Sequence, residues 1–187
     1  MWTKFKRTFI GDRNFYRKVI YIVIPMIIQN AITSFVNFLD NIMVGQIGTE
    51  QMTGVAIVNQ LIFVFNLCIF GAVSGAGIFG TQYYGKGDYE GQKYAFRYKL
   101  YSGLMIIALA LYLFTSWDAQ LISLYLNDTG SVGDISKTLE YGQQYLSIMI
   151  WGLPAFAISQ IYINSIRETG KTVIPMISGA VAVAVNL

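Results

Sequence analysis

Long apolar stretches bounded by charged segments are the feature of this sequence that most constrains its fold. Crossing the hydrocarbon core of a bilayer takes about 20 helical residues, and the first four stretches suit that length. Only 12% of the 187 residues are charged, whereas a soluble domain carries about 25%. We therefore predict an all-α fold, a polytopic bundle of membrane helices. The five stretches are residues 19–44, 54–80, 100–117, 145–163 and 173–187.

The basic residues predict the orientation of this bundle. They gather in an N-terminal arm, in the loop after the second stretch and in the loop after the fourth. These segments share one side of the membrane if successive stretches alternate in direction, and by the positive-inside rule that side is the cytoplasm. We expect a multi-pass protein of the cell membrane with a cytoplasmic N-terminus and no nucleic-acid partner. All Lys and Arg residues except Lys137 lie in the three segments: Lys4, Lys6, Arg7, Arg13, Arg17, Lys18, Lys86, Lys93, Arg97, Lys99, Arg167 and Lys171.

The sequence offers no chemistry that is typical of an enzyme. It has no His and a single cysteine, Cys68, which excludes His-based zinc sites, Ser-His-Asp catalysis and a disulfide framework. Residues 75–80 spell G-x-G-x-x-G, but they end an apolar helix and follow no strand, so close helix packing explains them better than a dinucleotide site. We predict that the protein is not an enzyme.

Asp40 is the only acidic residue inside any apolar stretch. A carboxylate at membrane depth costs about 2.5–3.5 kcal/mol on insertion scales and therefore usually faces a protein interior or a water-filled cavity. At 100° per residue, Gln29, Thr33 and Asn37 lie on the same helical face as Asp40. This stripe predicts a hydrated cavity in which Asp40 binds a cation or a proton.

Other polar residues and one proline complete the expected cavity. Asn59 and Asn66 are seven residues apart and share one face of the second stretch; they either line the cavity or hydrogen-bond between helices. Pro25 removes a backbone donor inside the first stretch and favours a kink, so we expect a hinge there. Residues 118–141 are expected to form an external polar loop with a short amphipathic piece at 119–126.

Three segments of the chain resemble the N-terminal half of a multidrug and toxic compound extrusion (MATE) transporter. They are Asp-Asn-Ile-Met-Val-Gly-Gln-Ile-Gly at 40–48, Gln-Tyr-Tyr-Gly-Lys-Gly-Asp at 82–88, and Ile-Arg-Glu-Thr-Gly-Lys-Thr at 166–172 with Pro175. They follow one another in the order of the family and on the expected sides of the membrane. The resemblance implies twelve helices in two six-helix lobes around a central cavity.

The resemblance also implies a function and two site residues. Members of the family export organic cations and other amphipathic drugs or toxins in exchange for Na⁺ or H⁺, and they need no other cofactor. Asp40 matches the coupling-ion residue of helix one, and Asn186 matches an Asn of helix five. No metal is expected beyond a possible Na⁺ at Asp40, and the coupling ion stays open between Na⁺ and H⁺.

The last apolar stretch bears on how much of a transporter is present. Residues 173–187 give a helix about 22 Å long, against a hydrocarbon core of about 30 Å. We therefore expect residues 1–187 to be an N-terminal lobe fragment, truncated in helix five, whose partners are the bilayer, the small-molecule drugs and a missing C-terminal lobe.

Two alternatives keep the membrane but change the function. A lipid-linked sugar flippase of the same superfamily would share the helix layout, but we would expect more cationic residues inside its helices to hold pyrophosphate, and the five stretches contain no Lys or Arg. A non-transporting membrane subunit or oligomeric pore would leave Asp40 and the three motif segments without a role.

Overall fold

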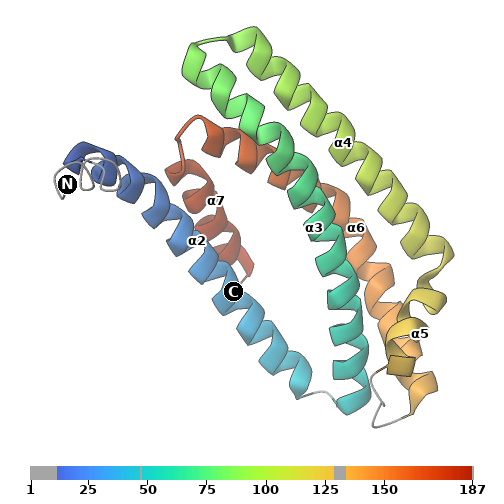
Figure 1. The fold of residues 1–187 in the computed structure, drawn as a ribbon. Coiled ribbons are helices and arrows are strands. Elements are labelled where there is room, and N and C mark those ends of the chain that lie inside the picture. Colours follow the sequence, from blue (N-terminus) through green and yellow to red (C-terminus); the bar gives the residue numbers. More distant parts are fainter. Residues whose placement is uncertain (1–11, 47, 129–133, 187) are drawn as a thin grey trace, which may run out of the picture. The chain divides into compact units, whose positions relative to one another are not determined.

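The structure is a computed structural model that describes residues 12–46, 48–128 and 134–186. Every regular element in these ranges is an α-helix (Figure 1). Four of the described helices are long and apolar enough to cross a membrane, and the shorter α7 is also apolar. The predicted all-α membrane helix bundle is confirmed. The helices are α2 (Arg13–Gly45), α3 (Thr49–Lys86), α4 (Tyr89–Ser116), α5 (Asp118–Asp128), α6 (Ile135–Glu168) and α7 (Val173–Asn186).

The chain divides into two compact units. One contains the described residues of Met1–Phe38 and Gly170–Leu187, hence most of α2 together with α7; the other contains Leu39–Thr169, with α3, α4, α5 and α6. In the second unit α3 packs against both α4 and α6, which also contact each other, and Figure 1 shows the three running side by side. This second unit, the larger of the two, therefore has a core of its own.

Rows of buried residues four positions apart build this core. On α3 the row is formed by Ile57, Leu61, Phe65, Ile69 and Val73. Residues at this spacing form an inclined ridge that fits between the side chains of a neighbouring helix. The outward faces of the same helices remain apolar and exposed, as is expected of surfaces that contact lipid.

Small residues bring α3 and α6 close together. A Cβ atom added to Gly54 would lie 2.9 Å from the carbonyl oxygen of Thr138 and 2.9 Å from the backbone nitrogen of Gly142. Only glycine leaves room for two backbones at this separation, which is the packing mode that small residues permit in membrane helices. The interface is therefore set by backbone contact at one end of α3.

The helices extend further than the apolar stretches predicted. α4 begins at Tyr89 rather than Leu100, and α6 begins at Ile135 rather than Tyr145. The expected loop at 118–141 is wrong in its second part, because residues from Ile135 onward are helical, whereas the amphipathic piece is present as α5. A hydropathy window detects only the segment that suits lipid, and polar helical turns beyond it escape detection.

The motif segment 82–88 contains the end of α3 and the turn to α4, and only Gly87 and Asp88 separate the two helices. Gly87 has a φ of 73°, a left-handed conformation that glycine adopts without a steric penalty. The amide of Asp88 donates to the carbonyl of Tyr83 at 2.9 Å, which closes α3. The side chain of Asp88 then accepts from the amide of Gly91 at 2.9 Å and so caps α4.

The smaller unit places Pro25 within α2, where its ring is buried. The side chain of Gln29, one turn further along, approaches α7, since a Cβ atom on Gly179 would lie 3.4 Å from it. α7 begins at Val173, as expected from sequence, with Pro175 in its first turn. Pro25 is thus interior to a continuous helix, and its role as a hinge stays a prediction.

Candidate functional site

Asp40 lies near the end of α2, within reach of α6. Its carboxylate lies near the hydroxyl of Tyr145 on α6. That hydroxyl donates a long hydrogen bond of 3.4 Å to the side-chain oxygen of Asn59 on α3. Three helices therefore contribute to one polar cluster, which we call the Asp40 cluster: Asp40, Asn59 and Tyr145. The exposed side chains of Asp40 and Asn59 can take up a cation or water.

The other predicted residues of α2 belong to the smaller unit. Thr33 and Asn37 are exposed, and Gln29 is half-buried. The hydroxyl of Thr33 donates to the backbone carbonyl of Gln29 at 3.0 Å, so its proton is engaged within the helix while its lone pairs can still accept. That these residues share a cavity with Asp40 stays a prediction.

Asn66 and Asn186 have different positions from Asn59. The side-chain oxygen of Asn66 is buried and has no hydrogen-bond donor among the described residues, whereas Asn59 is exposed. Asn186 is the last residue of α7, and its side chain lies outside the described part of the chain. The structure thus places Asn59 beside Tyr145, and the roles of Asn59, Asn66 and Asn186 stay predictions.

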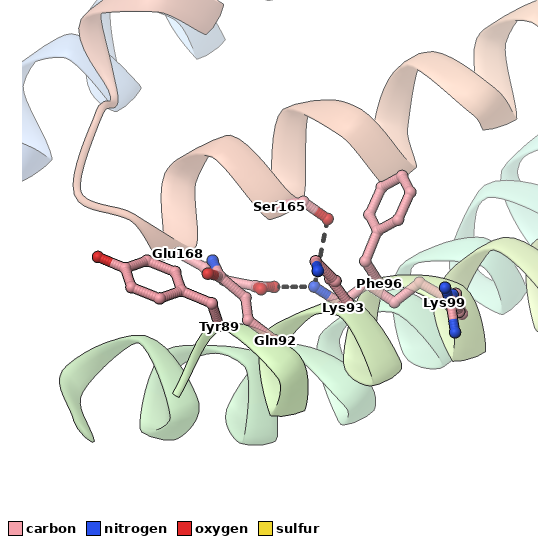
Figure 2. A pocket seen from close by; sticks show the side chains of 8 residues that line it. Tyr89, Gln92, Lys93, Phe96, Lys99, Ser165 and Glu168 are labelled. Atoms are coloured by element: carbon pink, nitrogen blue, oxygen red, sulfur yellow. Dashed lines mark hydrogen bonds and ion pairs between the residues drawn. The ribbon is translucent and has the colours of Figure 1, made fainter. Parts of the chain in front are cut away.

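A second polar cluster lies between α4 and α6 and was not predicted. The ammonium of Lys99 forms an ion pair with the carboxylate of Glu168, and the exposed fractions of the two side chains are 1% and 8%. The ammonium also donates to the hydroxyl of Ser165 at 3.4 Å. Figure 2 shows Ser165 and Glu168 reaching from α6 toward α4. A buried charge of this kind is tolerated only with a partner.

Glycines of α3 make room for this ion pair. A Cβ atom on Gly77 would lie 2.7 Å from one carboxylate oxygen of Glu168, and a Cβ atom on Gly80 would collide with the other. The run 75–80 that resembles a dinucleotide motif therefore serves helix packing, in agreement with the sequence analysis. Gly77 and Gly80 in this run leave space for the charged side chain of Glu168 from α6.

A cavity of about 360 Å³ opens beside the ion pair. It lies between the start of α4 and the end of α6, and Figure 2 shows the side chains around it. Phe96 and the carbon atoms of the longer side chains give it mostly apolar walls, and the other lining residues also carry polar or charged groups. The lining residues are Tyr89, Gln92, Lys93, Phe96, Arg97, Lys99, Ser165 and Glu168.

Sequence reasoning missed Lys99 and Tyr145 for different reasons. Lys99 was assigned to a loop, but it occupies a row of buried small and apolar residues on α4 with Ala95, Gly103 and Ile107. The four-residue spacing of that row could have revealed it. Tyr145 stood at the edge of an apolar stretch, and no local pattern relates it to Asp40.

Comparison with known families decides what kind of protein this is. A model of the MatE family matches residues 25–187, which includes all three motif segments. The chain belongs to the MatE family. No curated protein and no solved structure matched it. As a MatE protein with four apolar helices of spanning length among its described residues, it is a membrane protein and a transporter of this family.

The three MatE motif segments have a common structural role, since each ends a helix. Residues 40–48 end α2, residues 82–88 end α3, and residues 166–172 end α6. Gly170 has a φ of 75°, so the last segment turns the chain as Gly87 does. Two charged motif residues, Asp40 and Glu168, belong to polar clusters that join different helices.

Proposed function

We propose that this MatE transporter is a cation-coupled antiporter that exports organic cations and other amphipathic drugs or toxins. The coupling ion is Na⁺ or H⁺, and no other cofactor takes part. The observation that carries the proposal is the Asp40 cluster, in which a carboxylate from an apolar helix lies near Tyr145, itself hydrogen-bonded to Asn59. An acidic residue in a membrane helix is a common element of ion and proton pathways.

Competition for one negative charge explains how exchange would work. When Asp40 binds Na⁺ or a proton, its charge is neutralised, and a cationic substrate loses an attractive partner. When the ion leaves, the carboxylate can again attract the substrate. Tyr145 lies on α6 and Asn59 on α3, so a change in the charge of Asp40 on α2 alters the electrostatic environment of all three helices. It can therefore bias their packing.

The proposal extends to the surroundings of the chain. A second, related lobe completes the central cavity, and the protein is placed in the cell membrane with its N-terminus in the cytoplasm. Asn186 joins the coupling site from α7, and Gln29, Thr33, Asn37 and Asn66 line the cavity. Pro25 allows α2 to bend between packing states.

A lipid-linked sugar flippase receives less support from the contacts. Such a protein would use free cationic side chains in the membrane-embedded parts of its helices to bind pyrophosphate, and the apolar stretches contain no Lys or Arg. α4 does contain a deeply buried cation, Lys99, but its charge is already neutralised by Glu168. The anion of a lipid-linked sugar would have to displace that carboxylate.

The test replaces Asp40 by Asn in the transporter that contains this chain. The substitution keeps the size of the side chain and removes its charge. Efflux of an organic cation is measured in vesicles under an imposed H⁺ gradient and, separately, under an imposed Na⁺ gradient. We expect ion-driven efflux to be lost while membrane expression is kept.

Glu140→Gln is the matched control, because Glu140 is an exposed carboxylate near the start of α6. It makes the same chemical change outside the Asp40 cluster and should transport normally. Transport at the wild-type rate by Asp40→Asn under both gradients would refute the coupling role.

A further inference from the structure

The cavity between the start of α4 and the end of α6 carries a positive charge that has no role in the proposed transport. Its lining includes three cations, Lys93, Arg97 and Lys99, and one carboxylate, Glu168. Glu168 neutralises Lys99. Lys93 and Arg97 therefore give the cavity a positive charge, and at a spacing of four residues they stand on one face of α4.

These two cations are available to a ligand. Lys93 pairs with Glu90 at 2.6 Å, but both side chains are well exposed, and such a surface pair is weak and easily exchanged. Arg97 rests on the ring of Tyr94, 5.7 Å from its centre. Among the described residues, no carboxylate is paired with Arg97. An incoming anion can thus bind both cations without breaking the buried Lys99 pair.

Exposed tyrosines indicate the depth of this cavity in the membrane. Tyr89, Tyr94 and Tyr98 have exposed fractions between 64% and 71%, and all three lie in the part of α4 that precedes the apolar stretch 100–117. Tyrosines on the surface of membrane proteins concentrate at the level of the lipid headgroups, where the ring is apolar and the hydroxyl is wet. The cavity is therefore at headgroup depth, on the side that the basic residues predict to be cytoplasmic.

We propose that this cavity binds the phosphate headgroup of an anionic glycerophospholipid. The phosphate lies between Lys93 and Arg97, Gln92 is placed to donate to the headgroup, and Phe96 contacts the start of an acyl chain. A cavity of about 360 Å³ is large enough for a small headgroup, within the range of about 300–1,000 Å³ that is typical of ligand pockets. Basic pockets between membrane helices on the cytoplasmic side bind such headgroups in other proteins.

The inference does not depend on which substrate is transported. A lipid held here would bridge α4 and α6 next to the Lys99–Glu168 pair, so the composition of the membrane would affect the stability of the larger unit. Free phosphate or glycerol phosphate shares the headgroup chemistry, but it lacks the acyl chain for which Phe96 provides a surface.

The experiment compares the purified transporter in nanodiscs of phosphatidylcholine alone and in nanodiscs that also contain phosphatidylglycerol. Native mass spectrometry after release measures retained lipid, and thermal unfolding measures stabilisation. We expect preferential retention of phosphatidylglycerol and a higher unfolding temperature in its presence. Each of Lys93→Gln and Arg97→Gln should lower the affinity for phosphatidylglycerol about fivefold.

Lys86→Gln is the matched control, because Lys86 is an exposed cation at the end of α3 that does not line the cavity. Retention should be unchanged in that variant. Equal losses in all three variants would show that diffuse surface charge attracts the lipid and would overturn the proposed site. An equal retention of both lipids, or equal stabilisation by soluble glycerol phosphate in phosphatidylcholine nanodiscs, would also overturn it.

Discussion

Lys99 and Glu168 are 69 residues apart in the chain, yet their charged groups meet between α4 and α6 with almost no exposure. The pair ties the start of one helix to the end of another at the site where α3 presents glycines.

Removing one member of the buried pair should destabilise the protein strongly. Glu168→Gln leaves the Lys99 ammonium buried without a counter-charge, which costs about 3–5 kcal/mol in comparable buried pairs. The double variant Lys99→Met with Glu168→Met should recover most of that loss, because both charges are gone. Unfolding of the purified wild type, Lys99→Met, Glu168→Met and the double variant forms a double-mutant cycle that measures the coupling.

The exposed pair of Glu90 and Lys93 provides a comparison. Its 2.6 Å distance is short, but the exposed fractions are 71% and 60%, so Glu90→Gln should change stability by less than about 1 kcal/mol. Similar losses from Glu90→Gln and Glu168→Gln would show that burial does not decide the strength of these pairs.

Gly77→Ala should disturb the same contact from α3. The new Cβ atom would lie 2.7 Å from a carboxylate oxygen of Glu168, and overpacking of this kind typically costs about 1–3 kcal/mol. Gly75→Ala is the control on the same helix, because nothing lies within 4 Å of its added Cβ atom. We expect a lower unfolding temperature for Gly77→Ala only; a larger loss from Gly75→Ala would contradict the packing described.

Tyr145→Phe tests the Asp40 cluster without removing a charge. The substitution deletes the hydroxyl that lies near Asp40 and donates to Asn59. If the hydroxyl helps to place ligands around the ion, ion-driven efflux should fall several-fold but less than in Asp40→Asn, since water can replace a neutral group. Tyr162→Phe on the same helix should leave efflux unchanged, and equal efflux by both variants would exclude a role for Tyr145.

Cysteine labelling tests the predicted orientation. In a background that lacks Cys68, cysteines at Lys93 and Lys171 should react only with membrane-permeant reagents in intact cells. A cysteine at Lys137 should react with impermeant reagents from outside. All three side chains belong to exposed positions, so accessibility follows from the side of the membrane, and the reverse labelling pattern would invert the topology.

The sequence was sufficient for the fold class because lipid imposes a simple pattern of long apolar helices. It predicted the start of α7 at Val173. Three motif segments predicted the family of the chain. The sequence could not place the starts of α4 and α6, because the polar turns that contain Lys93 or Lys137 are helical through packing and capping rather than hydropathy. Asp40 stood out as an isolated charge, whereas its neighbour Tyr145 is a tertiary contact.

The polar cluster around Lys99 was hidden for a related reason. A lysine is normally assigned to a surface, and only the alignment with Ala95 and Gly103 indicates that it faces a core. Its partner Glu168 lies in a motif segment whose other residues predict a turn, and nothing in that pattern predicts a buried charge. Contacts between residues far apart in the chain cannot be predicted from a local sequence pattern.

The turn at Gly87 and Asp88 has a consequence for how the chain assembles during its synthesis. Closing a loop costs more entropy as the number of enclosed residues grows, so α3 and α4, joined by two residues, can pair as soon as both have been made. α6 must wait for the intervening chain. α3 and α4 therefore form a template that already carries Lys99 and the glycines of α3, and the arrival of Glu168 completes the unit last.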